Sequence, residues 1–195
     1  MASFVERVVG AATLKVATYE EIEADKGATG QAITVVALAS LAVGVAQAVG
    51  WFFIGGPISA VVALVGYTIL AVAGWFVWTL VTLIVGTKIL PEPETKSDMG
   101  ELMRTVGFAQ APGMLRIVTI IPILGWLIGL VVWVWMLAAF VIAARQALDY
   151  KSTIRAVVVC AIGWVVNLVV VEVIGRFILV FVLALVGAPT EGTGG

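Results

Sequence analysis

The sequence contains no histidine and a single cysteine. Without histidine, the chain can form neither a serine–histidine or cysteine–histidine catalytic pair nor an imidazole-ligated metal site. The cysteine, Cys160, has no intrachain disulfide partner, and its place in an apolar run is typical of a small buried hydrophobic residue. The aspartates Asp25, Asp98 and Asp149 all fall in polar segments, which leaves no pair of intramembrane catalytic aspartates. We therefore expect no enzymatic activity, no cofactor and no metal site.

Charged residues are also scarce. They make up 12% of the 195 residues, whereas hydrophobic residues make up 62%, and an ordinary soluble domain has roughly 25% charged residues. The mean hydropathy is +1.16. The net charge of −1 leaves no basic excess for neutralising phosphates, so a nucleic-acid partner is excluded. The composition indicates an integral membrane protein whose main partner is the lipid bilayer.

Long apolar runs predict the membrane-spanning helices, because a run of about 18 residues or more is long enough to cross a bilayer. Gly55, Gly56 and Pro57 separate the first two runs, and Pro122 and Gly125 divide the long run that follows the polar linker. The fold class that we predict is an all-α, polytopic transmembrane bundle of five spans. The spans are expected at about residues 32–50, 57–86, 105–122, 125–146 and 154–186, all within a transmembrane domain of residues 30–187.

Lysine and arginine predict the orientation, because they gather in cytoplasmic segments of membrane proteins. Basic residues occur before the first run, between the second and third runs, and between the fourth and fifth. The other connections and the tail, residues 188–195, have none. We therefore expect a protein of the inner cell membrane with a cytoplasmic N-terminus and an outside C-terminus. The nine residues are Arg7, Lys15 and Lys26; Lys88, Lys96 and Arg104; and Arg145, Lys151 and Arg155.

Residues 1–29 are expected to form a cytoplasmic, amphipathic and acidic segment. Apolar residues from Val5 to Val16 recur at helical spacing, which predicts an amphipathic helix on the membrane surface. Thr18 and Glu21 have the spacing of a capping box, which predicts that a second helix starts at Thr18. An acidic run follows, either as an ordinary solvated face or as a docking site for a basic protein partner. Its residues are Glu20, Glu21, Glu23 and Asp25.

Several short stretches resemble the Yip1 family of membrane proteins. They are residues 18–25 and 28–32, the segment Gly107 to Pro112, residues 121–125, Val134-Trp135, and residues 143–148. The resemblance covers roughly residues 15–175 and is to the prokaryotic branch. It implies a cytosolic N-terminus and a bundle of five helices. Because eukaryotic members bind GTPases at the membrane, it also implies a non-catalytic scaffold or adaptor that recruits partners at its cytoplasmic face.

Four polar residues fall inside the apolar runs and form a candidate intramembrane polar cluster: Arg116, Asn167, Glu172 and Arg176. Because charges in a bilayer face the bundle interior and find partners, we expect Arg116 to contact Asn167 or Glu172. In the alternative, Arg116 extends to the cytoplasmic interface, and Glu172 can pair with Arg176 four residues on. The cluster also raises a second function, a small-solute or ion permease. The small number of such residues favours the scaffold.

Two further features concern helix packing. Pro112 and Gly113 predict a kink in the span 105–122, because proline removes a backbone donor. Small residues at four-residue spacing let helices approach closely in lipid, either within the bundle or in a homo-oligomer. These residues are Ser40, Gly44 and Ala48, and Gly125 and Gly129.

Overall fold

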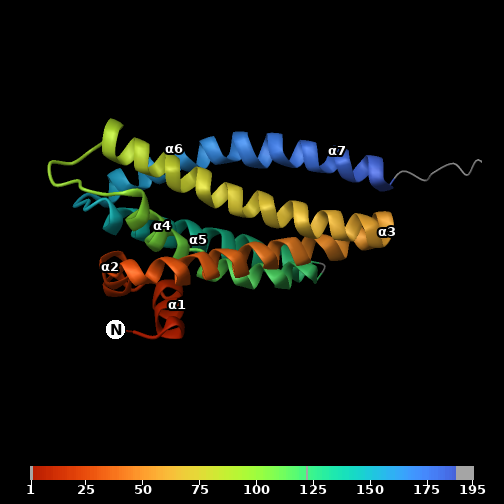
Figure 1. Ribbon diagram of the computed structural model, residues 1–195, viewed down its shortest axis with the longest axis horizontal. Helices are drawn as coiled ribbons and strands as arrows, with labels where there is room; N and C mark the ends of the chain where they lie inside the picture. The colour runs from red at the N-terminus through yellow and green to blue at the C-terminus, as the bar shows by residue number, and fades with distance from the viewer. Residues whose placement is uncertain (1, 122, 188–195) are drawn as a thin grey trace, which may run out of the picture.

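The computed structural model describes residues 2–121 and 123–187, and these residues form an elongated helical bundle (Figure 1). No strand occurs in these two ranges. The first elements are α1 (Phe4–Ala12), α2 (Val16–Ala24), η1 (Lys26–Ala28), α3 (Thr29–Ile84) and η2 (Val85–Ile89). The next are α4 (Met99–Phe108), η3 (Ala111–Ile120), α5 (Leu124–Ala147), α6 (Thr153–Asn167), η4 (Leu168–Gly175) and α7 (Arg176–Gly187). The predicted outside tail, residues 188–195, lies outside the described residues.

The longest element, α3, reverses direction at Gly56. Gly56 has φ 76° and ψ −169°, a conformation that a residue without a Cβ adopts at low cost. The arms before and after it lie side by side (Figure 1). Gly44 on the first arm lies close to Thr68 and the Leu64 carbonyl on the second, so that a Cβ at position 44 would collide with them. This small residue therefore serves packing inside the chain.

The predicted number of spanning helices is wrong. Among the described residues, three helices are long and apolar enough to cross a membrane: Lys26–Ile89, Leu124–Ala147 and Thr153–Val186. The expected spans 32–50 and 57–86 are the two arms of the first of these, on either side of the reversal at Gly56, where the sequence predicted a break. The expected span 105–122 is not one long α-helix. The expected spans 125–146 and 154–186 coincide closely with the other two helices.

The segment expected as the third span divides into α4 and η3. Asp98 caps α4 in a reciprocal arrangement with Glu101, and the α-helix ends at Phe108. Pro112 is at the start of η3, where its missing N–H leaves no hydrogen bond broken. η3 is a 3-10 helix of ten residues, which rises about 20 Å, compared with about 15 Å for an α-helix of that length. Gly113 packs against Ala39 and Met136.

The last apolar run changes its helix type along its length. α6 passes into a π-helix, η4, and then into α7. The π segment ends at Gly175, which contacts the Leu70 side chain.

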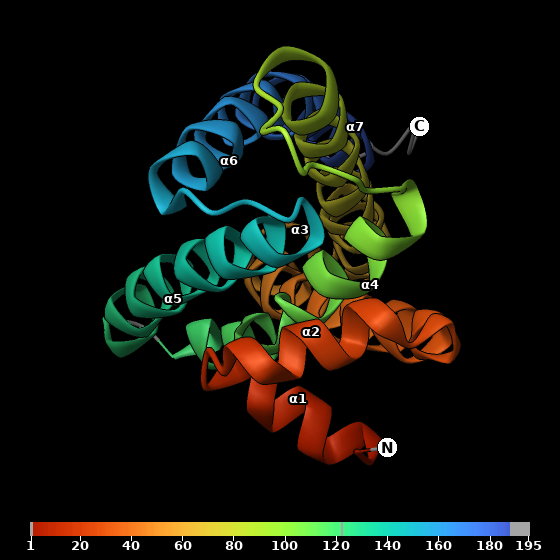
Figure 2. The same cartoon turned by 90° about the vertical axis from the view of Figure 1, so that its left-hand side faces the viewer.

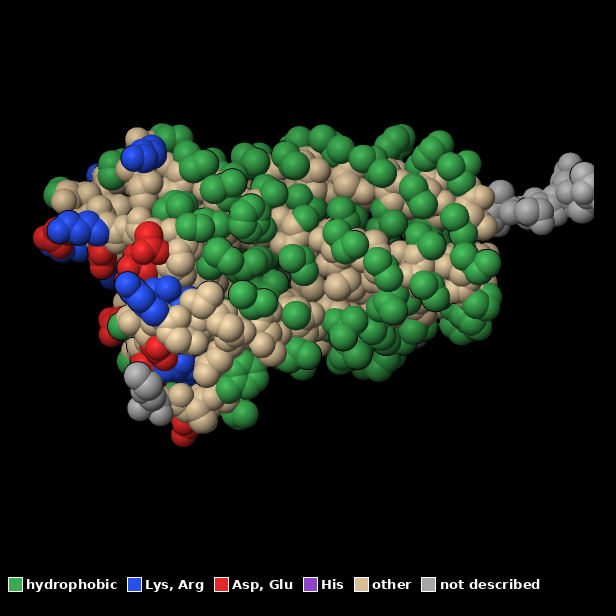
Figure 3. Space-filling view, in the orientation of Figure 1, with side chains coloured by type: hydrophobic (Ala, Val, Ile, Leu, Met, Phe, Trp, Pro, Cys, Tyr) green, Lys and Arg blue, Asp and Glu red, His purple; other side chains and the backbone are tan. Residues whose placement is uncertain are grey.

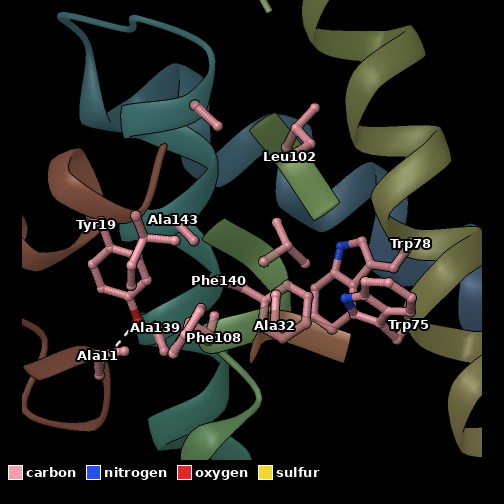
Figure 4. Packing of buried hydrophobic residues seen from close by; sticks show 14 of the residues in the cluster. Ala11, Tyr19, Ala32, Trp75, Trp78, Leu102, Phe108, Ala139, Phe140 and Ala143 are labelled. Carbon is pink, nitrogen blue, oxygen red and sulfur yellow. Dashed lines mark hydrogen bonds between the residues drawn. The ribbon is translucent and has the colours of Figure 1, made fainter. Parts of the chain in front are cut away.

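The hydrophobic core is concentrated toward the end of the bundle that carries the N-terminal helices. Trp78 stacks on Phe140 with ring centroids 4.1 Å apart, and its indole N–H donates to the Cys160 carbonyl at 3.1 Å. Figure 4 shows Trp75 beside Trp78 and Phe140, and Tyr19 bonded to Ala11. Outside this cluster, large apolar side chains are exposed along the length of the bundle, as expected for a surface that faces lipid (Figure 3).

The N-terminal helices α1 and α2 lie against one side of this end (Figure 2). α1 begins with a capping box between Ser3 and Glu6. The predicted start of the second helix at Thr18 is wrong: α2 begins at Val16, after Lys15, whose side chain provides no cap. Thr18 instead packs against Gly10 of α1. Thr18 therefore belongs to the contact between α1 and α2 and is not the cap that the sequence pattern predicted.

Candidate functional site

A buried ion pair takes up half of the acidic run. The Arg7 side chain is 2% exposed, and its Nη2 lies 3.0 Å from Glu21 Oε1 and 2.6 Å from Asp25 Oδ2. Its Nη1 donates to Gln31 at 3.1 Å. The Ala2 backbone N–H and Arg7 both lower the pKa of Glu21, and Arg7 with the Gly27 N–H lowers the pKa of Asp25. These two carboxylates hold α1 and α2 together.

The other two acidic residues line a cavity at the charged end. Glu20 accepts a hydrogen bond from Gln146 Nε2 at 3.0 Å. Glu23 is half-buried, and its backbone carbonyl accepts from Arg104 Nη2 at 2.6 Å. Burial, together with the nearby Asp149 carboxylate, raises the pKa of Glu23 to about 7. The cavity has a volume of about 370 Å³ and is lined by Glu20, Glu23, Glu94, Arg145, Gln146, Asp149, Tyr150 and Lys151.

The two connections at this end, residues 90–98 and 148–152, are bonded to each other. Lys151 pairs with Glu94 at 2.7 Å, and its backbone N–H donates to Glu92. The Tyr150 hydroxyl lies 2.7 Å from the Leu90 carbonyl. None of these contacts was anticipated from the sequence, because each joins residues about 60 positions apart. We call α1, α2 and these two connections the charged platform.

Three of the four residues of the candidate polar cluster line two adjoining cavities farther along the bundle. The inner cavity, of about 280 Å³, is lined by Arg116, Asn167 and Arg176 among other residues. The Arg176 guanidinium lies 6.0 Å from the Tyr67 ring centroid. Glu172 lies in η4. Arg116 and Asn167 thus line one cavity, and the direct contact expected between Arg116 and Asn167 or Glu172 stays a prediction.

Two residues that line the inner cavity each carry one buried polar atom without a hydrogen-bond partner. They are Nε1 of Trp75 and Oδ1 of Asn167, on residues that are 6% and 9% exposed. An unsatisfied buried donor or acceptor costs about 1–3 kcal/mol. Trp75 lies in the second apolar run of the sequence. No signal in the apolar run around it distinguished it from its neighbours.

The outer cavity, of about 570 Å³, adjoins the inner one and has four lining residues in common with it: Val43, Arg116, Trp133 and Arg176. Its remaining lining comes mainly from the turn after η3 and the start of α5, including Ile121, Ile123, Gly125, Trp126 and Leu130. We call the two cavities together the cleft.

The helix type of η3 positions one side of the cleft. Residues three apart are aligned on a 3-10 helix, and Gln110, Gly113, Arg116 and Thr119 follow this spacing. The first three line the inner cavity, and Arg116 and Thr119 line the outer one. Trp78 lines the inner cavity and stacks on Phe140 in the packed core, which lies toward the charged end (Figure 4).

Comparison with known proteins gives one match. The model of the Yip1 domain family matches residues 11–174, which include the charged platform from the end of α1 onward and most of the cleft. Searches of curated proteins and of solved structures found no match. The chain therefore belongs to the Yip1 domain family of membrane proteins.

Proposed function

We propose that this protein is a non-catalytic membrane scaffold or adaptor of the inner membrane, which recruits a protein partner through a cytoplasmic charged platform. The observation that supports this proposal is the segregation of charge. Apart from Arg116, Glu172 and Arg176, the charged residues in the described ranges gather at the platform end (Figure 3). Because basic residues gather on the cytoplasmic side, this end faces the cytoplasm. The Gly56 reversal then lies at the outside face.

The platform is suited to binding because internal bonds fix it in place. The buried Arg7 holds α1 and α2 together. Glu92 and Glu94 of the first connection bond to Lys151 of the second. The cavity between them has four acidic and two basic lining residues. Charge complementarity favours a partner segment with basic side chains. A preformed site of this kind costs little ordering on binding.

The orientation can be tested by cysteine accessibility in a Cys160→Ala background. We expect a cysteine at position 96 to react with an impermeant reagent only from the cytoplasmic side. A cysteine at position 55 should react only from outside. Labelling of position 96 from outside would refute the proposed orientation and, with it, the cytoplasmic platform.

Partner recruitment can be tested by cross-linking in native membranes followed by recovery of the full chain. The double variant Glu20→Lys, Asp149→Lys reverses two charges at the rim of the platform cavity, and we expect about a tenfold loss of bound partner. Lys26→Glu, which reverses an exposed charge outside this cavity, serves as the control. Equal recovery from the double variant and the unmodified chain would contradict recruitment at this surface.

A permease is the second candidate, and the polar lining of the cleft favours it. Permeation requires a path through the bundle, whereas packed side chains around Trp78 and Phe140 close the cleft toward the platform. This packing favours the scaffold. Uptake of a small anion into vesicles that contain the protein, above the uptake of empty vesicles, would favour the permease instead.

A further inference from the structure

We propose that the cleft is a binding site for one anionic phospholipid. The lipid phosphate lies near Arg116 and Arg176, and the acyl chains leave through the outer cavity toward the bilayer. This site is separate from the charged platform and does not depend on the proposed scaffold role.

The first support is charge. Arg116 and Arg176 line both cavities of the cleft. With Glu172, they are the ionisable residues within the apolar runs that form η3, η4 and the start of α7, and they leave one positive charge in excess. Ionisable residues inside a membrane are costly to bury and mark binding sites or ion pathways. A bound phosphodiester anion would balance this excess, and guanidinium groups form strong charge-assisted hydrogen bonds with phosphate.

The second support is the polar lining of the inner cavity, where Gln110 and Asn167 accompany the two arginines. Both side chains end in an amide, which offers donors and an acceptor. A phosphoglycerol headgroup carries both complementary groups, since its ester and phosphate oxygens accept and its hydroxyls donate.

The third support is access from the lipid phase. α5 packs against α6, but in the described ranges it makes no extended contact with α7, so the helices separate beside the outer cavity. Large apolar side chains surround this opening: Ile123 is 91% exposed and Trp126 is 75% exposed. A lipid reaches such an opening by lateral diffusion within the leaflet. The outer cavity, at about 570 Å³, is within the size range of small-molecule sites.

Because the cleft is closed at one end, we expect the lipid to stay bound in it and not to pass through the bundle. Trp133 and Trp164 meet edge to face at 5.8 Å and join α5 to α6 beside the inner cavity. Beyond them, Trp78 stacks on Phe140. Packed side chains therefore stop a lipid that enters from the open side before it reaches the platform.

Native mass spectrometry of the full-length chain in detergent tests the proposal. The probes are dioleoyl phosphatidylglycerol, dioleoyl phosphatidylcholine and inorganic phosphate. We expect one phosphatidylglycerol to be retained per chain at concentrations where phosphatidylcholine is lost. Arg116→Gln and Arg176→Gln should each weaken its binding about tenfold. The matched control is Arg155→Gln, which removes the same charge from a half-exposed arginine on the platform side.

A second variant keeps the test valid if an arginine substitution prevents folding. Ala46→Trp fills the outer cavity from the first arm of α3 and changes no charge, so we expect it to exclude the lipid while the thermal unfolding transition is retained. Equal binding of the two lipids, or unchanged binding in Ala46→Trp and both arginine variants, would overturn the proposal. Displacement of the lipid by millimolar inorganic phosphate would also overturn it, because the site would then recognise a free anion.

Discussion

The substitution Arg7→Gln tests how the N-terminal helices are held. The Arg7 side chain is 2% exposed and lies between two carboxylates, at 3.0 Å from Glu21 and 2.6 Å from Asp25. Glutamine has no charge, so both carboxylates lose their partner. We expect α1 and α2 to open more often, while the rest of the bundle stays folded.

The magnitude follows from the burial of the two acidic partners. Breaking a fully buried ion pair costs about 3–5 kcal/mol. Here the Glu21 side chain is 38% exposed and that of Asp25 is 20% exposed, so water regains access to both carboxylates. We therefore expect a loss of about 2 kcal/mol, which corresponds to an opening constant raised about thirtyfold. Hydrogen exchange of the amides in residues 4–24, measured in lipid nanodiscs, reports this opening.

The pH dependence provides a second readout. The folded-state pKa values of Glu21 and Asp25 are lowered from their ordinary values of 4.5 and 3.8. Stabilisation by these groups is therefore present above those values and is lost as the pH falls below them. Arg7→Gln should weaken this dependence but not abolish it, because the Ala2 and Gly27 N–H groups still lower the two pKa values, whereas Lys15→Gln, at an exposed position, should retain it in full. Unchanged amide protection in Arg7→Gln at neutral pH would refute the reasoning.

Three further substitutions test other parts of the structure by thermal unfolding. The pKa of Glu23 is raised to about 7, so ionisation of its carboxyl group costs stability as the pH rises from 4.5 through 7. Glu23→Gln should therefore raise the Tm by a few degrees at pH 8 and leave it unchanged at pH 4. Gly44→Leu should separate the arms of α3 and cost about 1–3 kcal/mol, while Gly50→Leu, with open space around the Cβ position, should cost less. Tyr150→Phe should cost about 1 kcal/mol, because the Leu90 carbonyl loses its donor.

The positions of most apolar helices could be predicted from the sequence. The expected spans 125–146 and 154–186 agree within two residues with helices of the structure, because in lipid a backbone must satisfy its hydrogen bonds within the segment. The helix count could not be predicted in the same way. The break expected at Gly55 to Pro57 is present at Gly56, but hydropathy did not show that residues 105–122 divide into α4 and η3 instead of forming one long helix.

The contacts of the acidic run could not be predicted from local pattern. Glu21 and Asp25 pair with Arg7 across 14 and 18 residues, and this pairing requires α1 to pack on α2. One local signal was available. Arg7, Gly10 and Ala11 occupy one face of a helix, and all three are buried. Two small residues beside an arginine at this spacing indicate a packed face. The valines at helical spacing indicated the opposite face instead.

The same limit applies to η3, where helix type determines which residues meet. Gln110, Gly113, Arg116 and Thr119 are spaced by three, a pattern that is visible in the sequence. On an α-helix, with 3.6 residues per turn, these four residues would spread over about 180° of the circumference. On a 3-10 helix, with three residues per turn, they align in one row. Hydropathy does not distinguish the two helices. The row that lines the cleft therefore exists only because the chain after Phe108 winds more tightly, and Pro112 at the start of η3 favours that change.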